Sequence, residues 1–262
     1  MSRAWFPALL AVALAVVLTF LVLPVVAIFV QQPPGDLLDA LGEQGALDAF
    51  WLSLRTTAAA LALILGLGTP AAYLLATRRF RGRSLVITLI ELPLVLPPAV
   101  AGIALLASLG PQGLLGGAVD AAGVQLTLAT AGVVVALTFV AAPFYLRQAI
   151  AAFEAVEPTL LDASRTLGAS PARTFWLVAV PTARAGLTAG TALALGRALG
   201  EFGATLMFAG SFEGITQTVP LAIYDRFATD FTAALALSAV LVAVSAAILL
   251  AVKLVRGPDA VR

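Results

Sequence analysis

The chain has 262 residues, of which 61% are hydrophobic and only 11% are charged, and its formal net charge is +1. A soluble domain carries about 25% charged residues, so this chain cannot cover a water-facing surface and lipid must cover most of it. Cysteine and histidine are both absent, which excludes disulfides, the usual zinc sites and catalysis by histidine. The nearly neutral charge gives no indication of binding to nucleic acid.

Six apolar segments are each long enough to cross the hydrocarbon core of a bilayer, which takes about 20 helical residues. They lie near residues 8–30, 52–76, 86–109, 126–145, 185–209 and 231–255. The segments show no internal repeat, so we expect a single membrane domain over residues 1–262. The predicted fold class is all-α and integral to the membrane, with six transmembrane helices.

Arginine and lysine are distributed unevenly between the two sides of such a fold. Twelve of the fifteen lie in the loops after the second and fourth segments or near the termini, among them Arg79, Arg165, Arg3 and Arg256. Because loops rich in arginine and lysine stay in the cytoplasm, we expect both termini to be cytoplasmic. The segment 146–184 between the fourth and fifth spans is then cytoplasmic as well.

This cytoplasmic segment contains residues that are typical of helix ends. Pro158 favours a helix start, because proline at the first helical position loses no hydrogen bond. Gly168 favours a helix stop, and Pro171 favours the start of the next helix. Pro181 would interrupt the chain just before the fifth span. We therefore expect a short helix at 157–168 that is presented to the cytosol. The same pattern also suits an amphipathic loop helix that lies on the bilayer.

The third apolar segment contains Pro93, Pro97 and Pro98, which remove backbone donors and break a helix. Freed carbonyls at this depth are tolerated against protein or water rather than against lipid. The segment is therefore either a hinged helix that lines a path or a kinked packing helix. Glu91 lies one or two turns from its cytoplasmic end, where the side chain could simply reach the interface.

The fifth apolar segment carries Arg197 near its midpoint, and Glu201 follows four residues later on the same helical face. A charge at this depth costs about 2.5 kcal/mol or more, so Arg197 must be paired or face a water-filled cavity. Two interpretations stay open. One is an intramembrane ion pair that locks helix packing, and the other is an anion path to which Arg197 lends positive potential.

The spacing within the cytoplasmic segment is more specific than its helix ends. Asp162-Ala163-Ser164 is followed after three residues by Gly168, and after nine more by Val178-Ala179-Val180-Pro181. This resembles the signature of permease subunits of ABC importers, which is Glu-Ala-Ala, three residues, Gly, nine residues, Ile-x-Leu-Pro. The resemblance implies that the short cytoplasmic helix couples this chain to a separate ATP-binding subunit. The residues implied for this contact are Leu160, Asp162, Ala163, Ser164, Gly168, Ala169 and Pro181.

Three further runs look like the molybdate and tungstate branch of these permeases, within an oxyanion family that includes sulfate permeases. They are residues 92–98, 197–205 and 216–224. The resemblance implies a permease subunit of an ATP-driven importer that moves molybdate or tungstate into the cytoplasm. A sulfate or thiosulfate permease is the alternative, and a secondary anion carrier is a more distant one. The residues expected along the translocation path are Pro93, Pro97, Pro98, Arg197, Glu201 and Thr205.

The expected partners follow from the same resemblance. The chain lacks the pattern G-x-x-x-x-G-K-[ST] of P-loop ATPases, so we expect a partner to bind ATP and Mg²⁺, and this chain to have no catalytic residue, metal or cofactor of its own. The resemblance implies a homodimer, two copies of a P-loop ATPase subunit and an extracytoplasmic protein that binds the oxyanion. It also implies a multi-pass protein of the prokaryotic inner or plasma membrane.

Overall fold

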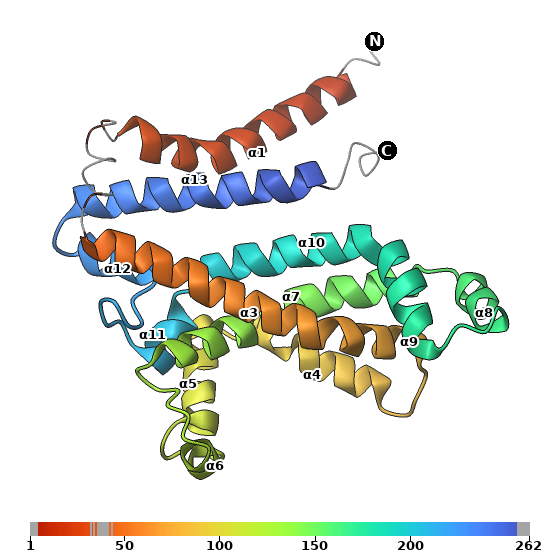
Figure 1. Cartoon of the computed structure of the whole chain (residues 1–262). Coiled ribbons are helices and arrows are strands. Elements are labelled where there is room, and N and C mark those ends of the chain that lie inside the picture. The colour runs from red at the N-terminus through yellow and green to blue at the C-terminus, as the bar shows by residue number, and fades with distance from the viewer. Residues whose placement is uncertain (1–4, 32, 34, 36–41, 43, 256–262) are drawn as a thin grey trace.

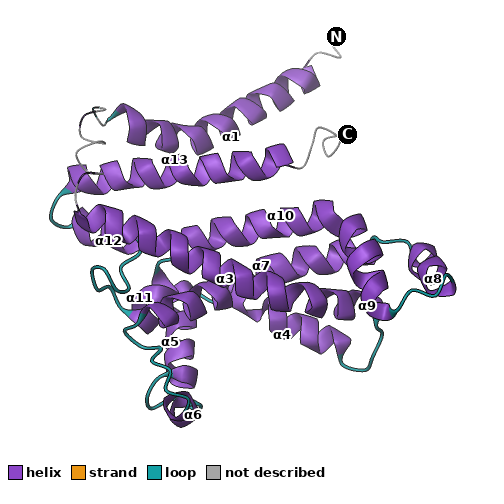
Figure 2. Cartoon of the chain, viewed as in Figure 1, coloured by secondary structure: helices purple, strands orange, loops and turns teal. Residues whose placement is uncertain are grey.

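The computed structural model describes residues 5–31, 33, 35, 42 and 44–255, and these contain helices and loops but no strand (Figures 1 and 2). The longer helices are α1 (Trp5–Val30), α3 (Gln44–Thr77), α4 (Arg83–Val95), α5 (Pro98–Leu109), α7 (Thr130–Glu154), α10 (Val180–Leu199) and α13 (Phe231–Val255). The shorter helices are α6 (Gly116–Ala121), α8 (Pro158–Thr166), α9 (Pro171–Thr174), α11 (Gly203–Ala209) and α12 (Val219–Phe227).

Five helical stretches are long and apolar enough to cross a membrane. They are Trp5–Val30, Gly45–Thr77, Thr130–Glu154, Pro171–Leu199 and Phe231–Ile248. A sixth candidate is the pair α4 and α5, which meets the same test together but bends by 119° at its break. A helix satisfies its own backbone hydrogen bonds, which a segment in lipid requires. The predicted all-α membrane fold is confirmed.

The fourth and fifth spans have different bounds from those predicted. α7 begins at Thr130 and continues to Glu154, well beyond the predicted end at residue 145. The fifth span begins at Pro171 and ends at Leu199, whereas residues 185–209 were predicted. As a result, only residues 155–170 lie outside the long helical stretches between these two spans.

The prediction that Pro181 interrupts the chain before the fifth span is wrong. A π-helical turn at Phe175–Ala179 joins α9 to α10, and the Val180 N–H donates to the Phe175 carbonyl. This wider turn places Pro181 at the start of α10, where a missing backbone donor is tolerated. The helical course therefore runs on through the proline.

α7 lies at the centre of the bundle and packs against α3 on one side and α10 on the other (Figure 1). The Tyr145 hydroxyl and the Thr69 hydroxyl lie 2.6 Å apart and tie α7 to α3. A Cβ atom on Gly190 of α10 would lie 3.1 Å from the Gln148 Cβ of α7. Small residues of this kind let membrane helices approach closely.

α1 has a different environment from the central helices. None of its residues is buried, and it lies beside α13, away from α3 and α7 (Figure 1). The first turn of α1, the last turn of α13 and helix α8 lie toward the same end of the molecule (Figure 1). Arg3 and Arg256, which the prediction of cytoplasmic termini uses, lie outside the described residues.

Candidate coupling surface and translocation path

The two ends of α8 form as the sequence predicts. Pro158 is its first residue, and Gly168 has φ +84°, a left-handed conformation that favours glycine. The Gly168 N–H donates to the Arg165 carbonyl at 2.9 Å, and the Ala169 N–H donates to the Ser164 carbonyl at 3.1 Å. These two bonds satisfy the last carbonyls of the helix. The expected short helix at 157–168 is therefore confirmed.

Two contacts hold α8 on the bundle. Leu161 is its one buried residue and packs against Phe153 and neighbouring apolar side chains. The Ser164 hydroxyl lies 2.9 Å from the hydroxyl of Thr174, which is fully buried in α9. In α9, the Ser170 hydroxyl accepts from the Arg173 N–H at 3.3 Å, which confirms the predicted helix start. The helix is thus fixed at its inner face as well as at its ends.

Aromatic side chains form the base beneath α8. The ring of Tyr73 in α3 lies 5.3 Å from that of Phe153 in α7 and 4.9 Å from that of Phe175 in the π-helical turn, between ring centroids. These spacings fall in the favourable range of aromatic pairs. The three rings therefore join α3, α7 and the π-helical turn into one apolar layer.

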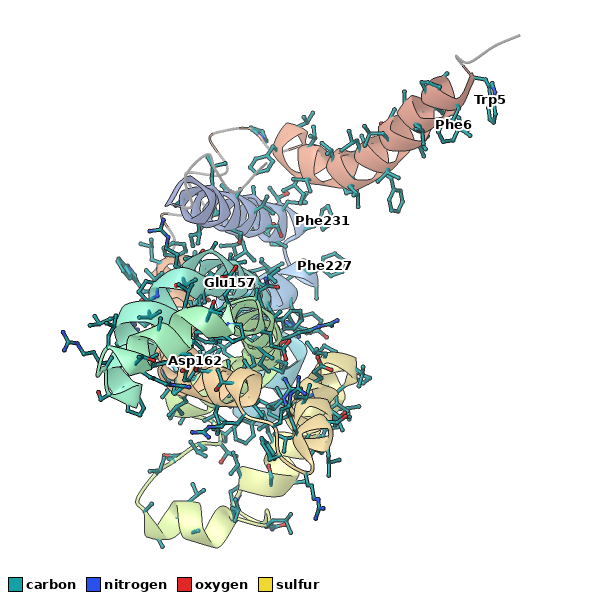
Figure 3. The ribbon with its side chains drawn as sticks, turned by 90° about the vertical axis from the view of Figure 1, so that its right-hand side faces the viewer. Trp5, Phe6, Glu157, Asp162, Phe227 and Phe231 are labelled. Atoms are coloured by element: carbon teal, nitrogen blue, oxygen red, sulfur yellow. The ribbon has the colours of Figure 1, made fainter. Side chains whose placement is uncertain are left out.

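The residues predicted for the contact with an ATPase do not all lie on the outer surface. Leu160, Asp162 and Ala163 are exposed, and Figure 3 shows Asp162 at the end of the molecule that carries α8. Ser164 instead faces Thr174. The remaining residues are distributed as follows: Gly168 is exposed at the helix end, Ala169 is partly buried, and Pro181 is exposed but belongs to α10.

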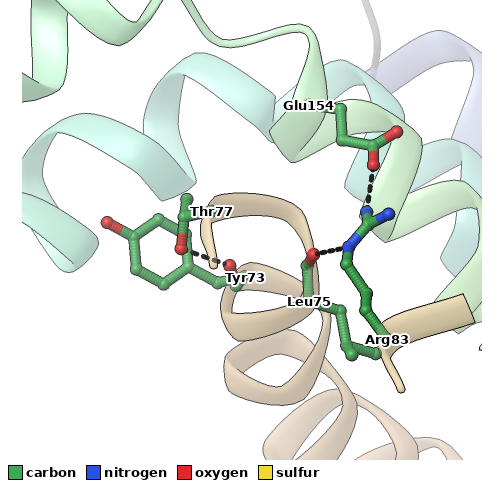
Figure 4. Close-up of polar contacts among 5 residues, drawn as sticks. All are labelled: Tyr73, Leu75, Thr77, Arg83 and Glu154. Carbon is green, nitrogen blue, oxygen red and sulfur yellow. Dashed lines mark hydrogen bonds and ion pairs between the residues drawn. The ribbon is translucent and has the colours of Figure 1, made fainter. Parts of the chain in front are cut away.

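Arg83 connects three helices near this base (Figure 4). It is the first residue of α4, and its Nε donates to the Leu75 carbonyl of α3 at 2.6 Å. Its Nη2 pairs with Oε1 of Glu154, the last residue of α7. The sequence identified Arg83 only as one of the basic loop residues, because no pattern along the chain brings residues 83 and 154 together.

A second ion pair joins α4 to α7. Arg147 Nε lies 3.7 Å from Glu91 Oε1, and the charges are reversed relative to the pair of Arg83 and Glu154. The two pairs lie about two turns apart along each helix. Glu91 therefore has a partner in α7, and α4 is attached to α7 at two points.

The third span is broken at Pro97 and Pro98, as predicted, whereas Pro93 lies inside α4 and does not break it. α4 ends at Val95, Leu96 is extended, and Pro98 begins α5 in a new direction. Figure 1 shows α5 turned across the direction of α4, in agreement with the 119° bend. The prolines therefore produce two separate helices rather than a kink in one.

The predicted fifth segment at residues 185–209 is also interrupted, and its break lies close to that of the third span. α10 ends at Leu199 and α11 begins at Gly203. A Cβ atom on Gly203 would lie 2.8 Å from the Pro98 Cβ, and one on Gly102 would lie 2.6 Å from the Met207 Cβ. Only glycine fits at these contacts, so α5 and α11 are packed in close contact beyond both breaks.

Arg197 and Glu201 form an ion pair at the break between α10 and α11. The prediction that Arg197 lies near the midpoint of its span is wrong, because it lies in the last turn of α10. Arg197 Nη2 lies 2.5 Å from Glu201 Oε2; the glutamate side chain is 0% exposed and the arginine side chain 25%. The other carboxylate oxygen, Oε1, accepts from the Ala204 N–H at 2.7 Å and so caps the start of α11. This geometry supports the packing interpretation, and the Arg197 side chain stays partly exposed. Thr205 is fully buried beside this cap.

The family described as "Binding-protein-dependent transport system inner membrane component" matches residues 68–256. The chain is 41% identical to the molybdenum transport system permease protein ModB of Mycobacterium tuberculosis over 235 residues, which are 90% of this chain and 89% of that protein. It is 32% identical to the sulfate transport system permease protein CysW of Synechocystis over 248 residues, which are 94% of this chain and 90% of that protein.

A solved structure has the same fold. One chain of a bacterial alginate ABC transporter, in complex with an alginate-bound periplasmic protein, superimposes with a TM-score of 0.75 at 17% sequence identity. The match covers 97% of this chain and 93% of that chain.

Proposed function

From the premise that the chain belongs to the family of binding-protein-dependent transport system inner membrane components, and is thus the permease subunit of an ABC importer, we propose that its cargo is molybdate. The observation that carries this choice is the identity of 41% to a molybdenum permease, against 32% to a sulfate permease over a similar length. Tungstate has the same charge and tetrahedral shape and is included in the proposal. A sulfate permease is the alternative.

The proposed complex contains two copies of this chain, two copies of a P-loop ATPase and an extracytoplasmic binding protein. The exposed outer face of α8 supports the ATPase contact, because a helix fixed at its base presents Leu160, Asp162 and Ala163 to a partner. Helix α1, none of whose residues is buried, supports a second copy, because a partner helix can pack on the surface that α13 leaves uncovered.

The proposed orientation places α8 and both termini in the cytoplasm of a prokaryotic cell. The arginine-rich loops support it, and so does the common end of the molecule at which α1 starts, α13 ends and α8 lies (Figure 1). ATP and Mg²⁺ then belong to the ATPase, on the side where α8 is exposed.

In the proposed mechanism, α8 is the part of this chain on which the ATPase acts. Closure of the ATPase moves α8, and its base of aromatic rings passes the motion to α3, α7 and α10. The two ion pairs carry α4 along with α7. α5 and α11 lie beyond the two breaks and share a buried apolar cluster with Ala136 and Val140 of α7. A movement of α7 is therefore proposed to reach both short helices.

The cargo carries two negative charges and would be unstable in a purely apolar path. Arg197 lies in the last turn of α10, beside the break, and its partly exposed side chain is proposed to lend positive potential to the path there. Glu201 offsets part of this potential, which favours passage over tight binding. The other residues proposed for the path are Pro93, Pro97, Pro98 and Thr205, of which Thr205 is fully buried within this chain.

Uptake in sealed vesicles that contain this chain, the ATPase and the binding protein tests the proposal. We expect ATP-dependent uptake of radiolabelled molybdate that unlabelled tungstate inhibits. Uptake of sulfate with no response to molybdate or tungstate would assign the chain to the sulfate branch. Uptake driven by an ion gradient without the ATPase would identify a secondary carrier instead.

A further inference from the structure

A cavity of about 510 Å³ lies between α8 and the turn that joins α3 to α4. Its volume falls in the range of about 300–1,000 Å³ that is usual for ligand pockets. The apolar part of its wall includes Phe153, Val156 and Leu161, and the charged part includes residues from the turn, from the end of α7 and from α8. The cavity is separate from the broken spans, and the mechanism above does not use it.

The charges that line the cavity do not balance. Its wall contains three arginines, Arg79, Arg83 and Arg165, and two carboxylates, Glu154 and Asp162, which leaves one positive charge in excess. Each carboxylate is already paired within the chain: Glu154 with Arg83, and Asp162 with Arg165 at 3.3 Å.

Arg79 is the arginine that remains. It lies exposed in the turn after α3, and no ion pair joins it to an acidic residue in the part of the chain that the structure describes. A planar guanidinium with five donors suits a carboxylate, which it can bind through two parallel hydrogen bonds. The cavity therefore has room and charge for one further carboxylate beside an apolar wall.

We infer that this cavity receives an acidic side chain of the ATP-binding subunit, which binds Arg79 while the same subunit holds α8. The inference rests on the proposed function. α8 contributes Leu161, Asp162 and Arg165 to the wall, so a partner that closes around α8 comes within reach of the cavity. A contact to Arg79 would let the partner bind both α8 and the turn between α3 and α4.

The test compares Arg79→Ala with Arg81→Ala. Arg81 lies two residues away in the same exposed turn but does not line the cavity, so it controls for the general positive charge of the loop. The variants are incorporated in nanodiscs of phosphatidylcholine, and the binding of the purified ATPase is measured. We expect Arg79→Ala to weaken binding about tenfold, the size of one charge-assisted hydrogen bond, and Arg81→Ala to leave it within about twofold.

Salt and a conservative variant sharpen the result. Added salt should weaken the binding of the original protein more than that of Arg79→Ala, because the variant has lost a screened charge contact. Arg79→Lys keeps the charge and should recover part of the affinity. Equal affinity of Arg79→Ala and Arg81→Ala would overturn the inference while leaving the docking of α8 intact. Absence of ATPase binding by the unaltered protein would instead refute the proposed function itself.

Two other occupants give different outcomes. If the cavity binds the phosphate of an anionic lipid, Arg79→Ala will weaken ATPase binding only in nanodiscs that contain phosphatidylglycerol. If it binds the released cargo, calorimetric titration of the chain alone with molybdate will give heat that Arg79→Ala abolishes, and ATPase binding will not change. Either result would overturn the assignment to an ATPase side chain.

Discussion

Replacement of Arg197 by alanine separates the two roles of the ion pair in the fifth span. Glu201 is completely buried, and its Oε2 lies 2.5 Å from Arg197 Nη2. In Arg197→Ala this oxygen loses its partner, because no hydrogen bond to another group reaches it in the described structure. Removing one member of a buried ion pair costs about 3–5 kcal/mol, so we expect a loss of stability of this size.

The double variant Arg197→Ala, Glu201→Ala removes the buried charge together with its partner. What remains lost is chiefly the cap on the Ala204 N–H, which is worth about 1 kcal/mol. The second substitution should therefore recover roughly 3 kcal/mol of the first loss, the difference between these two costs. Arg197→Ala, Glu201→Gln keeps an oxygen that can accept from Ala204 and should recover slightly more.

Unfolding in detergent measures these stabilities, and uptake in vesicles measures transport. Arg184→Ala is the matched control, because Arg184 lies exposed on the same helix with no ion pair in the described structure. If Arg197→Ala is as stable as this control but transports slowly, the packing argument is wrong and Arg197 acts on the anion alone. If the double variant is stable and still transports slowly, Arg197 has both roles.

Three further predictions concern coupling and orientation. Gly168→Asp places a side chain on a left-handed helix end, which costs about 1–3 kcal/mol. We expect a protein that still inserts in the membrane but has no ATP-driven uptake. Normal uptake and ATPase copurification would show that α8 is an ordinary loop helix. Glu91→Arg places two positive charges together, so it should lower the number of anions transported per ATP hydrolysed, and adding Arg147→Glu should restore that number. Equal transport by all variants would show that this pair does not couple α4 to α7. An impermeant thiol reagent applied from outside should label Glu213→Cys and spare Arg81→Cys, and the reverse result would invert the proposed orientation.

Local sequence predicts the features of this fold that depend on a few adjacent residues. The helix start at Pro158 and the stop at Gly168 are examples, because each depends on the conformation of one residue and its immediate hydrogen bonds. The sixth span was predicted at residues 231–255 and α13 has the same bounds, since an uninterrupted apolar run contains no alternative end.

Features that depend on how the surrounding chain folds were not predicted. Pro181 favours a helix break when it is considered alone. The π-helical turn before it places Pro181 at the start of α10, where a residue without a backbone N–H is tolerated. Arg83 looks like one loop arginine among several, and only the fold brings Glu154 and the Leu75 carbonyl to its guanidinium. Glu201 was predicted to share a helical face with Arg197, whereas the pair spans a helix break and caps the next helix.

At the two breaks, the prolines act locally on the backbone, and the glycines act through contacts between α5 and α11. Each break exposes backbone groups that lipid cannot satisfy, so each half-helix must lie against protein or water. The glycines at 102 and 203 let α5 and α11 satisfy this requirement against one another. A larger side chain at either glycine would force the two halves apart without changing the local tendency of either segment to be helical. The prolines at 97 and 98 therefore determine where the third span breaks, and the glycines allow the two broken ends to pack against one another.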